Sequence, residues 1–321
     1  MRSFQCNEGR SWCVFSGNMA TSCSPLLSVL AVLGSISFGV TSAEEVSKEA
    51  LSSVKFALTD AVESGKVAGG AHLVSHQGKV VHFETAGYRD AIDKTPFEKD
   101  TIVRIYSMTK PVTSVMAMTC YEQGKFQLDD PVSKFIPAFA KMKVVEGNKE
   151  DFKLVSPKRP LTVRDVFRHT TGYSYGNGHP AVKEAHDKEK LRYRPPSGMY
   201  PPDMSIEQAA EALARIPALH HPGERFTYGF STDLLGRLVE IWSGKTLDKA
   251  MTEVLFTPLG MNDTGFSVPS KKQARFASCH SIKEGRFVVV DKANDSAYNQ
   301  GFKFLSGGGG LVSTMSDYAN F

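Results

Sequence analysis

The order of strand-like and helix-like segments is the feature of this chain that most constrains its fold. Residues 70–75 and 79–85 have the pattern of two short strands that meet at Gln77-Gly78, which predicts a β-hairpin. Strand-like segments return only after Gly265, notably at 286–290, and most of the residues between are helical in pattern. We therefore predict an α+β fold, in which an antiparallel sheet flanked by helices is interrupted by an inserted helical region.

The helical segments are marked by apolar spacing and by residues typical of helix ends. Residues 46–64 carry apolar side chains at helical spacing and stop at Gly65, where a C-terminal cap is expected. Ser205 and Gln208 have the spacing of a capping box and open a helix that reaches Ile216. The other predicted helices cover 112–123, 161–168, 231–242 and 247–255, with a short one beginning at Asp129.

Ser107 and Lys110 form the pattern that points most directly to chemistry. They lie between an apolar run at 102–106 and the helical stretch 112–123, and residues three apart on a helix share one face. A serine hydroxyl is a weak nucleophile until a base takes its proton, and the lysine amine is placed beside it. Pro111 fits the first turn of a helix, whose unpaired N–H groups face any negative charge that develops there. Alone, the pattern is also that of a serine-capped helix start.

Tyr228 is the third candidate, in the segment 222–231 that leads directly into a helical stretch. A phenol accepts the serine proton if a nearby ammonium lowers the phenol pKa, and it returns that proton to a leaving group. A tyrosine taken alone usually serves only packing, so a catalytic role for Tyr228 depends on the other candidates, Ser107 and Lys110.

The N-terminal segment has the pattern of an export signal. Residues 26–43 are apolar, end in small residues at Thr41 and Ala43, and follow the basic residues Arg2 and Arg10. We predict a signal peptide over 1–43, export to the periplasm or the medium, and no stable membrane insertion after cleavage. A membrane span is the alternative, although the stretch is near the lower limit of length for one.

Composition excludes several other classes of function. The 321 residues are 41% hydrophobic and 22% charged, which is ordinary for one folded domain, and the net charge of +4 is scattered rather than gathered in a nucleic-acid-binding stripe. Cys120 and Cys279 are the cysteines that remain after the signal peptide, so no disulfide framework is predicted. No metal site is expected from the histidines at 72, 76 and 82, which lack ligand spacing. No nucleotide cofactor is expected either, because the glycine run 307–310 lacks the Gly-Lys-Ser/Thr ending of a phosphate loop.

Six ordered segments carry a likeness to one protein family. They are 104–111, which contains Ser107-Met108-Thr109-Lys110, then 128–132, 168–172, 222–231, 258–266 and 307–314. Together they resemble the serine hydrolases of the class C β-lactamase and penicillin-binding-protein family, especially its esterase branch. The likeness runs from about Val46 to the last residue. It implies a β-lactamase-like fold over a domain at 44–321, an acyl-enzyme reaction, and a small-molecule ester or amide as substrate.

The resemblance also implies a role for each candidate residue. Ser107 would be the acylated nucleophile, Lys110 the base or proton relay, and Tyr228 the group that activates water or protonates the leaving group. The backbone N–H of Ser107 would supply half of an oxyanion hole. Which of Lys110 and Tyr228 takes the first proton stays open, because two coupled groups titrate as a pair.

Phe230 sets the chain apart from the lactamase branch, which has an asparagine at that position to hold the substrate amide. An apolar residue there favours an ester or lactone, so we predict a carboxylesterase. We expect Tyr106, Tyr173, Tyr175 and Phe230 to line the substrate pocket. The alternatives are a β-lactamase, a D-alanyl-D-alanine carboxypeptidase-like peptidase, or a non-catalytic scaffold that retains the fold.

Two further expectations concern the C-terminal end and a second serine motif. The family carries a third motif, Lys-Thr-Gly or a variant, on a strand after the glycine run, whereas residues 313–321 begin a helix. We expect the chain to be truncated before that motif, half the oxyanion hole and part of the central sheet. Gly172-Tyr173-Ser174-Tyr175-Gly176 matches the nucleophile elbow of α/β-hydrolases, but a predicted helix precedes it where that motif needs a strand.

Overall fold

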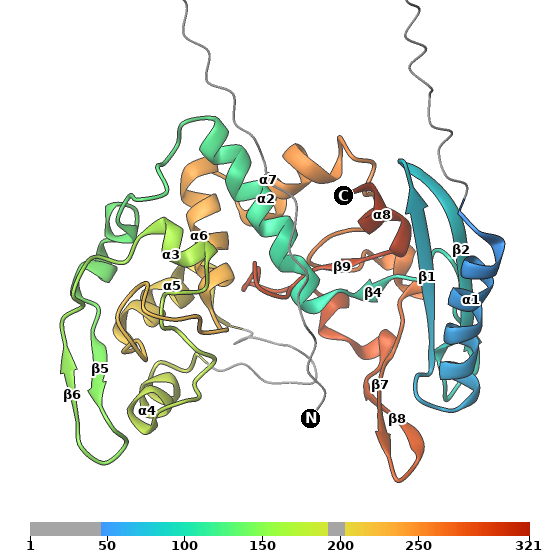
Figure 1. The fold of residues 1–321 in the computed structure, drawn as a ribbon, viewed down its shortest axis with the longest axis horizontal. Coiled ribbons are helices and arrows are strands. Elements are labelled where there is room, and N and C mark those ends of the chain that lie inside the picture. The colour runs from blue at the N-terminus through green and yellow to red at the C-terminus, as the bar shows by residue number, and fades with distance from the viewer. Residues whose placement is uncertain (1–45, 192–202) are drawn as a thin grey trace, which may run out of the picture. The chain divides into compact units, whose positions relative to one another are not determined.

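Short antiparallel strand pairs and helices alternate in the computed structural model, which describes residues 46–191 and 203–321 (Figure 1). The predicted signal peptide, residues 1–43, lies outside the described residues. The α-helices and strands of the described residues are, in chain order, α1 (Lys48–Glu63), β1 (Gly69–His76), β2 (Lys79–Asp90), β3 (Thr95–Pro96), β4 (Val103–Arg104), α2 (Thr109–Glu122), β5 (Val144–Gly147), β6 (Phe152–Val155), α3 (Val163–Phe167), α4 (Pro180–Lys188), α5 (Ile206–Arg215), α6 (Ser231–Ser243), α7 (Leu247–Met251), β7 (Cys279–Lys283), β8 (Arg286–Asp291), β9 (Val312–Ser313) and α8 (Met315–Asn320).

The N-terminal hairpin forms where the sequence predicts it. β1 and β2 pair antiparallel from Gly69 opposite Gly87 to His76 opposite Lys79. The two residues of the turn, Gln77 and Gly78, both have positive φ angles, 49° and 75°, as a turn that follows the twist of the strands requires. The helix α1 packs against both strands. The hairpin and its helix therefore fold as one local unit.

The helical region inserted between the hairpin and the later strands is built around α6. α2, α3, α5 and α7 all pack against α6, and Figure 1 shows the group beside the β5–β6 pair. Val112 of α2 and Leu238 and Val239 of α6 are fully buried in its core. The predicted helix at Asp129 is only a 3₁₀ turn, Val132–Lys134, since Pro131 leaves the chain extended before it.

A short strand pair joins two distant parts of the chain and positions the candidate site. β4 pairs antiparallel with β9, with Val103 opposite Ser313 and Arg104 opposite Val312. The pairing continues past the strand end, where Ile105 N–H donates to the carbonyl of Leu311 at 3.0 Å. The glycine run 307–310 is thereby brought next to the chain that carries Ser107.

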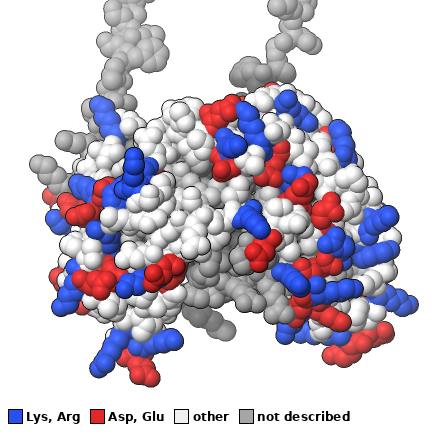
Figure 2. Space-filling view, turned by 180° about the vertical axis from the view of Figure 1, so that it is seen from behind, with Lys and Arg blue, Asp and Glu red and all other residues white. Residues whose placement is uncertain are grey.

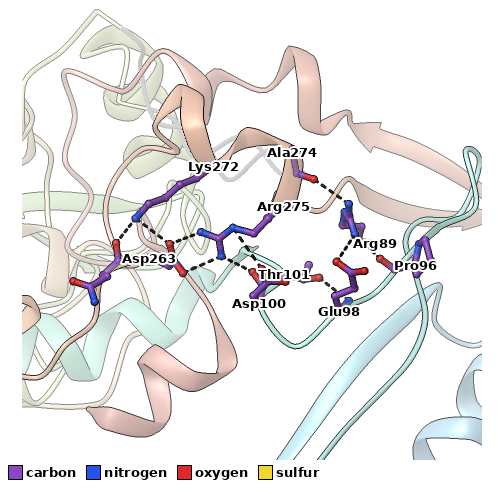
Figure 3. Close-up of polar contacts among 10 residues, drawn as sticks. Arg89, Pro96, Glu98, Asp100, Thr101, Asp263, Lys272, Ala274 and Arg275 are labelled. Atoms are coloured by element: carbon purple, nitrogen blue, oxygen red, sulfur yellow. Dashed lines mark hydrogen bonds and ion pairs between the residues drawn. The ribbon is translucent and has the colours of Figure 1, made fainter.

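Charged side chains tie the segment before β4 to the 3₁₀ helix Ser270–Arg275 (Figure 3). Arg275 donates to both carboxylate oxygens of Asp263, at 2.9 and 2.6 Å, and to the carbonyl of Asp100 at 2.8 Å. Arg89 of β2 donates to the carbonyls of Pro96 and Ala274, at 2.7 and 3.0 Å. These contacts fix the approach of the chain to β4, because a guanidinium with several acceptors has little freedom to move.

The surface carries both signs of charge. On the face drawn in Figure 2, Lys and Arg side chains alternate with Asp and Glu rather than gathering into one patch. A mixed surface of this kind is typical of a solvated face. Among the described residues, no helix is both long enough and apolar enough to cross a bilayer.

Candidate active site

Ser107 lies at a sharp turn between β4 and α2. It belongs to a 3₁₀ turn over Tyr106–Met108, and α2 begins directly after it at Thr109. Tyr106 has a φ of 42°, in the left-handed region that few aromatic residues adopt, so its surroundings must hold the turn in place. The side chain of Ser107 is exposed to solvent. α2 therefore begins earlier than residue 112, where the apolar spacing predicts its start. Ser107 lies two residues before its first residue, Thr109.

The hydroxyls of Ser107 and Tyr228 and the amine of Lys110 lie together. Ser107 Oγ is 2.6 Å from Tyr228 Oη, although the two residues are 121 positions apart in the sequence. Lys110 Nζ donates to Ser107 Oγ at 3.3 Å and lies 4.7 Å from the centroid of the Tyr228 ring. The structure thus brings the three candidate catalytic side chains into mutual contact.

The surroundings of Tyr228 make its hydroxyl a stronger acid than that of a free tyrosine. Burial by itself raises the pKa of Tyr228, but hydrogen bonds from Lys110 and Ser107 and the charge of Lys110 outweigh burial, and the pKa falls below its usual value. A phenol of lowered pKa loses its proton more readily near neutral pH. The resulting phenolate is placed to accept the Ser107 proton.

His169 packs against Tyr228 in the loop after α3. The two rings stack with centroids 5.4 Å apart and planes 13° from parallel. The carbonyl of His169 also accepts a hydrogen bond from the N–H of Thr227 at 2.7 Å, which fixes the backbone beside Tyr228. Burial, together with the charge of Lys110, lowers the pKa of His169 to about 4. The imidazole is therefore neutral at physiological pH and adds no positive charge to the site.

The glycine run 307–310 closes the side of Lys110 that faces away from Ser107. The carbonyl of Gly308 accepts from Lys110 Nζ at 2.5 Å. On α2, the Thr113 hydroxyl donates to the carbonyl of Gly307 at 2.8 Å. The backbone comes this close to α2 because glycines leave room for it.

Asp233 and His169 are site residues that sequence reasoning missed. Asp233, in the first turn of α6, accepts a hydrogen bond from the N–H of Gly308 at 3.0 Å. His169 lies inside the segment 168–172 that carries the family likeness, and Asp233 lies two residues after the segment 222–231, so these segments were a signal for both. Their own contacts were not predictable, because an acid in a first turn and a loop histidine are common for local reasons.

The backbone N–H of Ser107 is available for the role that the resemblance implies. No described residue accepts a hydrogen bond from this N–H, whereas the next N–H, of Met108, donates to the carbonyl of Ile105 at 2.9 Å. A free N–H beside a nucleophile can bind the oxygen of an attacked carbonyl.

The four residues expected in the substrate pocket occupy different places. Tyr175 is half-buried and meets the ring of Tyr228 edge-on at 5.8 Å and that of Phe230 at 4.9 Å. Phe230 is 1% exposed and also stacks on His186, with ring centroids 5.6 Å apart. It is thus a buried ring against which Tyr175 packs. Tyr175 is thus the member of the four whose ring contacts a candidate catalytic side chain.

Tyr173 and Tyr106 point elsewhere. Tyr173 is 1% exposed and packs edge-on against Phe139 at 5.9 Å, which places it in the hydrophobic core rather than at the rim of a pocket. Tyr106 directs its hydroxyl to Cys279 Sγ at 3.5 Å, and burial together with this contact raises the pKa of Tyr106. The Tyr106 hydroxyl is thus held at Cys279 of β7, although Tyr106 is adjacent to Ser107 in the sequence.

The second serine motif has a structural explanation. Ser174 is 2% exposed, and its hydroxyl donates to the carbonyl of Asn177 at 2.7 Å. A helix, α3, lies before it in the chain, and a nucleophile elbow needs a strand there. Ser174 stabilises a turn and is not presented to substrate.

Metal ligands do not gather in the described part of the chain. No group of three His, Cys, Asp or Glu side chains there is arranged to hold a metal ion. His72 and His82 are close, with parallel rings 4.7 Å apart, but they form a stacked pair.

The relatives found by sequence comparison include a protein named as an esterase. Protein Rv1367c of Mycobacterium tuberculosis is 31% identical over 265 residues, which cover 82% of this chain and 63% of that protein. Lovastatin esterase of Penicillium rubens is 29% identical over 265 residues, which cover 80% of this chain and 64% of the esterase. The chain thus spans less than two thirds of the length of these curated relatives.

Solved structures with a similar architecture include a hydrolase and a synthase. EstCE1, a hydrolase with promiscuous acyltransferase activity, matches with a TM-score of 0.71 and 25% identity, covering 85% of this chain and 71% of its own. Simvastatin synthase (LovD) from Aspergillus terreus matches with a TM-score of 0.68 and 25% identity, covering 84% and 66%. The predicted β-lactamase-like α+β fold is confirmed. A family model described as Beta-lactamase matches residues 55–321, and the chain belongs to that family.

Proposed function

We propose that this protein is a serine hydrolase that acts through an acyl-enzyme on Ser107, and that its substrates are small esters or lactones. The observation that carries the proposal is the contact of three side chains at one exposed point. Ser107 Oγ lies 2.6 Å from Tyr228 Oη and 3.3 Å from Lys110 Nζ. A hydroxyl that touches both a phenol of lowered pKa and an ammonium has the partners needed to lose its proton.

The reaction follows from these contacts. Ser107 Oγ attacks the carbonyl carbon while its proton passes to the pair formed by Tyr228 and Lys110, and the N–H of Ser107 binds the oxyanion. The pair returns that proton to the departing alkoxide, which leaves as an alcohol. Water then attacks the acyl-enzyme, gives one proton to the pair, and releases the carboxylic acid as Ser107 regains its proton.

The surface beside Ser107 supports an ester with apolar parts. Met108 and Phe226 are 49% and 65% exposed, and Tyr228 is 46% exposed. Phe226 also packs near His169, with ring centroids 5.6 Å apart, so it belongs to the same surface. Apolar side chains around a nucleophile favour hydrocarbon acyl or alcohol groups over the polar backbone of a peptide.

Acyl transfer to an alcohol is the second candidate. Ser107 and Tyr228 are exposed enough for an alcohol to reach the acyl-enzyme in place of water. EstCE1, a hydrolase with promiscuous acyltransferase activity, and simvastatin synthase share the fold. Addition of a small alcohol during ester turnover tests this: transfer yields a new ester, and hydrolysis alone yields only the acid.

Turnover of p-nitrophenyl esters tests the proposal itself. We expect Ser107→Ala to lower kcat by about a thousandfold or more, since removing a nucleophile leaves only binding and electrostatic effects. Ser174→Ala is the matched control, and it should retain activity. Ester turnover that survives in Ser107→Ala would overturn the proposal. Faster hydrolysis of nitrocefin or of a D-alanyl-D-alanine peptide than of esters would replace it with one of the alternative activities.

A further inference from the structure

Asp233 is a buried acid without an ion pair. It lies in the first turn of α6 and is 4% exposed. Its Oδ1 accepts from the Ser306 hydroxyl at 2.5 Å and from the N–H of Gly308 at 3.0 Å. No Lys or Arg among the described residues forms a salt bridge with it, and none of those residues hydrogen-bonds its Oδ2. A buried acid of this kind needs an explanation, because burial of an unpaired charge is costly.

Gly308 connects Asp233 to the candidate catalytic residues. Its N–H donates to Asp233, and its carbonyl accepts from Lys110 Nζ at 2.5 Å. A Cβ on Gly308 would lie 2.6 Å from Asp233 Oδ2, so the contact depends on a glycine. Asp233 and Lys110 therefore hold the same residue from two sides. Movement of Asp233 would move the carbonyl that orients the ammonium.

The other side of Asp233 is apolar. A cavity of about 10 Å³ is lined by Asp233 and by apolar side chains that include Ile206 and Ala210 of α5 and Phe304. The positive charge of Lys110, on α2, favours the carboxylate form of Asp233. The negative charge of Asp233 favours the protonated form of Tyr228. His169 faces Lys110 and Tyr228 from the loop after α3, where it is neutral. In such a poorly solvated place the interaction between the carboxylate and the ammonium is weakly screened.

We propose that Asp233 is a positioning residue that, as a carboxylate, fixes the Gly308 carbonyl against Lys110 and so orients the Lys110 amine toward Ser107 and Tyr228. The proposal rests on the function proposed for Ser107 and deepens it. Tyr228 is then the group that exchanges protons with Ser107. The lysine acts on the phenol by lowering its pKa and by orienting it.

The hydrogen bonds favour the charged form of the acid. Burial raises the pKa of the Asp233 carboxyl above its usual value, whereas the donors of Ser306 and Gly308 and the charge of Lys110 favour the carboxylate. Both groups bonded to Oδ1 are donors, which is the arrangement that a carboxylate needs. A negative charge at this place stabilises the protonated form of Tyr228. Its removal must therefore lower the pKa of that phenol.

The test is the pH profile of kcat/KM for a p-nitrophenyl ester with Asp233→Asn. Asparagine keeps the size of the side chain and an acceptor for Ser306 and Gly308, but it removes the charge. We expect the limb of the profile that reports Tyr228 to move to lower pH, by about one pH unit, because the charge of Asp233 raises the pKa of the phenol. Asp233→Ser is a second neutral variant, for use if Asn does not fold. Asp165→Asn is the matched control. Asp165 is a buried acid too, 2% exposed, but it lies in α3 and its carboxylate accepts a hydrogen bond from Arg159.

A uniform loss of activity with unmoved limbs would show that Asp233 is only structural and would overturn the inference. So would an equal movement in Asp165→Asn. The ultraviolet titration of Tyr228, taken as the difference between each protein and its Tyr228→Phe counterpart, does not depend on turnover. If the protein hydrolyses no ester, a shift of this titration in Asp233→Asn still supports the inference while the proposed function fails. An unshifted titration in a protein that does hydrolyse esters refutes the inference alone.

Discussion

The charge of each side chain around Ser107 depends on its immediate neighbours. Lys110 supplies the positive charge that lowers the pKa of both Tyr228 and His169. The consequences differ because the two groups differ in chemistry: a phenol becomes easier to ionise, and an imidazole becomes harder to protonate. The site therefore concentrates its positive charge on one amine. A second cation at His169 would compete with it for the phenolate.

His169 makes stability depend on pH. Its pKa is about 4 in the folded protein, below the value of 6.5 for a free histidine, because burial and Lys110 disfavour the charged form. Between pH 6.5 and about pH 4, the unfolded chain thus binds a proton at His169 that the folded chain does not bind. The stability that comes from the neutral imidazole is complete above pH 6.5 and is lost as the pH falls from there to about 4.

Urea unfolding checks this dependence. Between about pH 7 and about pH 4.5, the free energy of unfolding should fall more for the wild-type protein than for His169→Gln, which cannot titrate there. Other groups that titrate in this range contribute equally to both proteins and cancel in the difference. An equal fall in the two proteins would show that the surroundings of His169 do not oppose its protonation.

At the scale of elements, the site depends on the contact between the start of α6 and the glycine run. Gly308 lies between Asp233 and Lys110, and a Cβ there would lie 2.6 Å from Oδ2 of the Asp233 carboxylate, whose Oδ1 accepts from Ser306. Space for the extra carbon must come from movement of Asp233 or of the glycine run. Either movement changes the position of the Lys110 ammonium.

Gly308→Ala should therefore lower both stability and activity. We expect a loss of about 1–3 kcal/mol in the free energy of unfolding, as for other insertions into packed sites, with a fall in kcat larger than any change in KM. Gly265→Ala is the control, because the nearest atom to its added Cβ is 3.7 Å away, an ordinary contact. If the two variants show the same stability and the same kcat, the packing of Gly308 against Asp233 does not matter.

Elements with long periodic patterns were predictable, and those without them were not. The β1–β2 hairpin and the helix opened by Ser205 follow from local rules of turns and caps. β4 and β9 have two residues each, too few to show a period, and their pairing depends on contacts across most of the chain.

The candidate site divides in the same way. Ser107 and Lys110 are three positions apart and were predictable from helix geometry, whereas Tyr228 was assigned by resemblance. Tyr173 was expected at the pocket and is packed in the core, because a residue's neighbours in sequence do not fix the direction of its side chain in an irregular loop. The stacking of His169 on Tyr228 was not predictable for that same reason.

At the scale of the whole molecule, four separate parts of the chain build the site. They are the turn before α2, the loop after α3, the loop before α6 and the glycine run before β9. Contacts between residues so far apart in sequence form only as the whole fold forms, because the chain must first close long loops. Reactivity at Ser107 therefore reports on the correct assembly of the described domain.

Covalent labelling by a fluorophosphonate, followed by intact-mass measurement and peptide mapping, tests whether Ser107 is the nucleophile. It asks only whether one serine is made nucleophilic by its neighbours, and it needs no knowledge of the natural substrate. We expect one adduct per folded chain, located on the peptide that contains Ser107, and no adduct in Ser107→Ala. An adduct on Ser174, or a folded protein that takes up no label, would contradict the account.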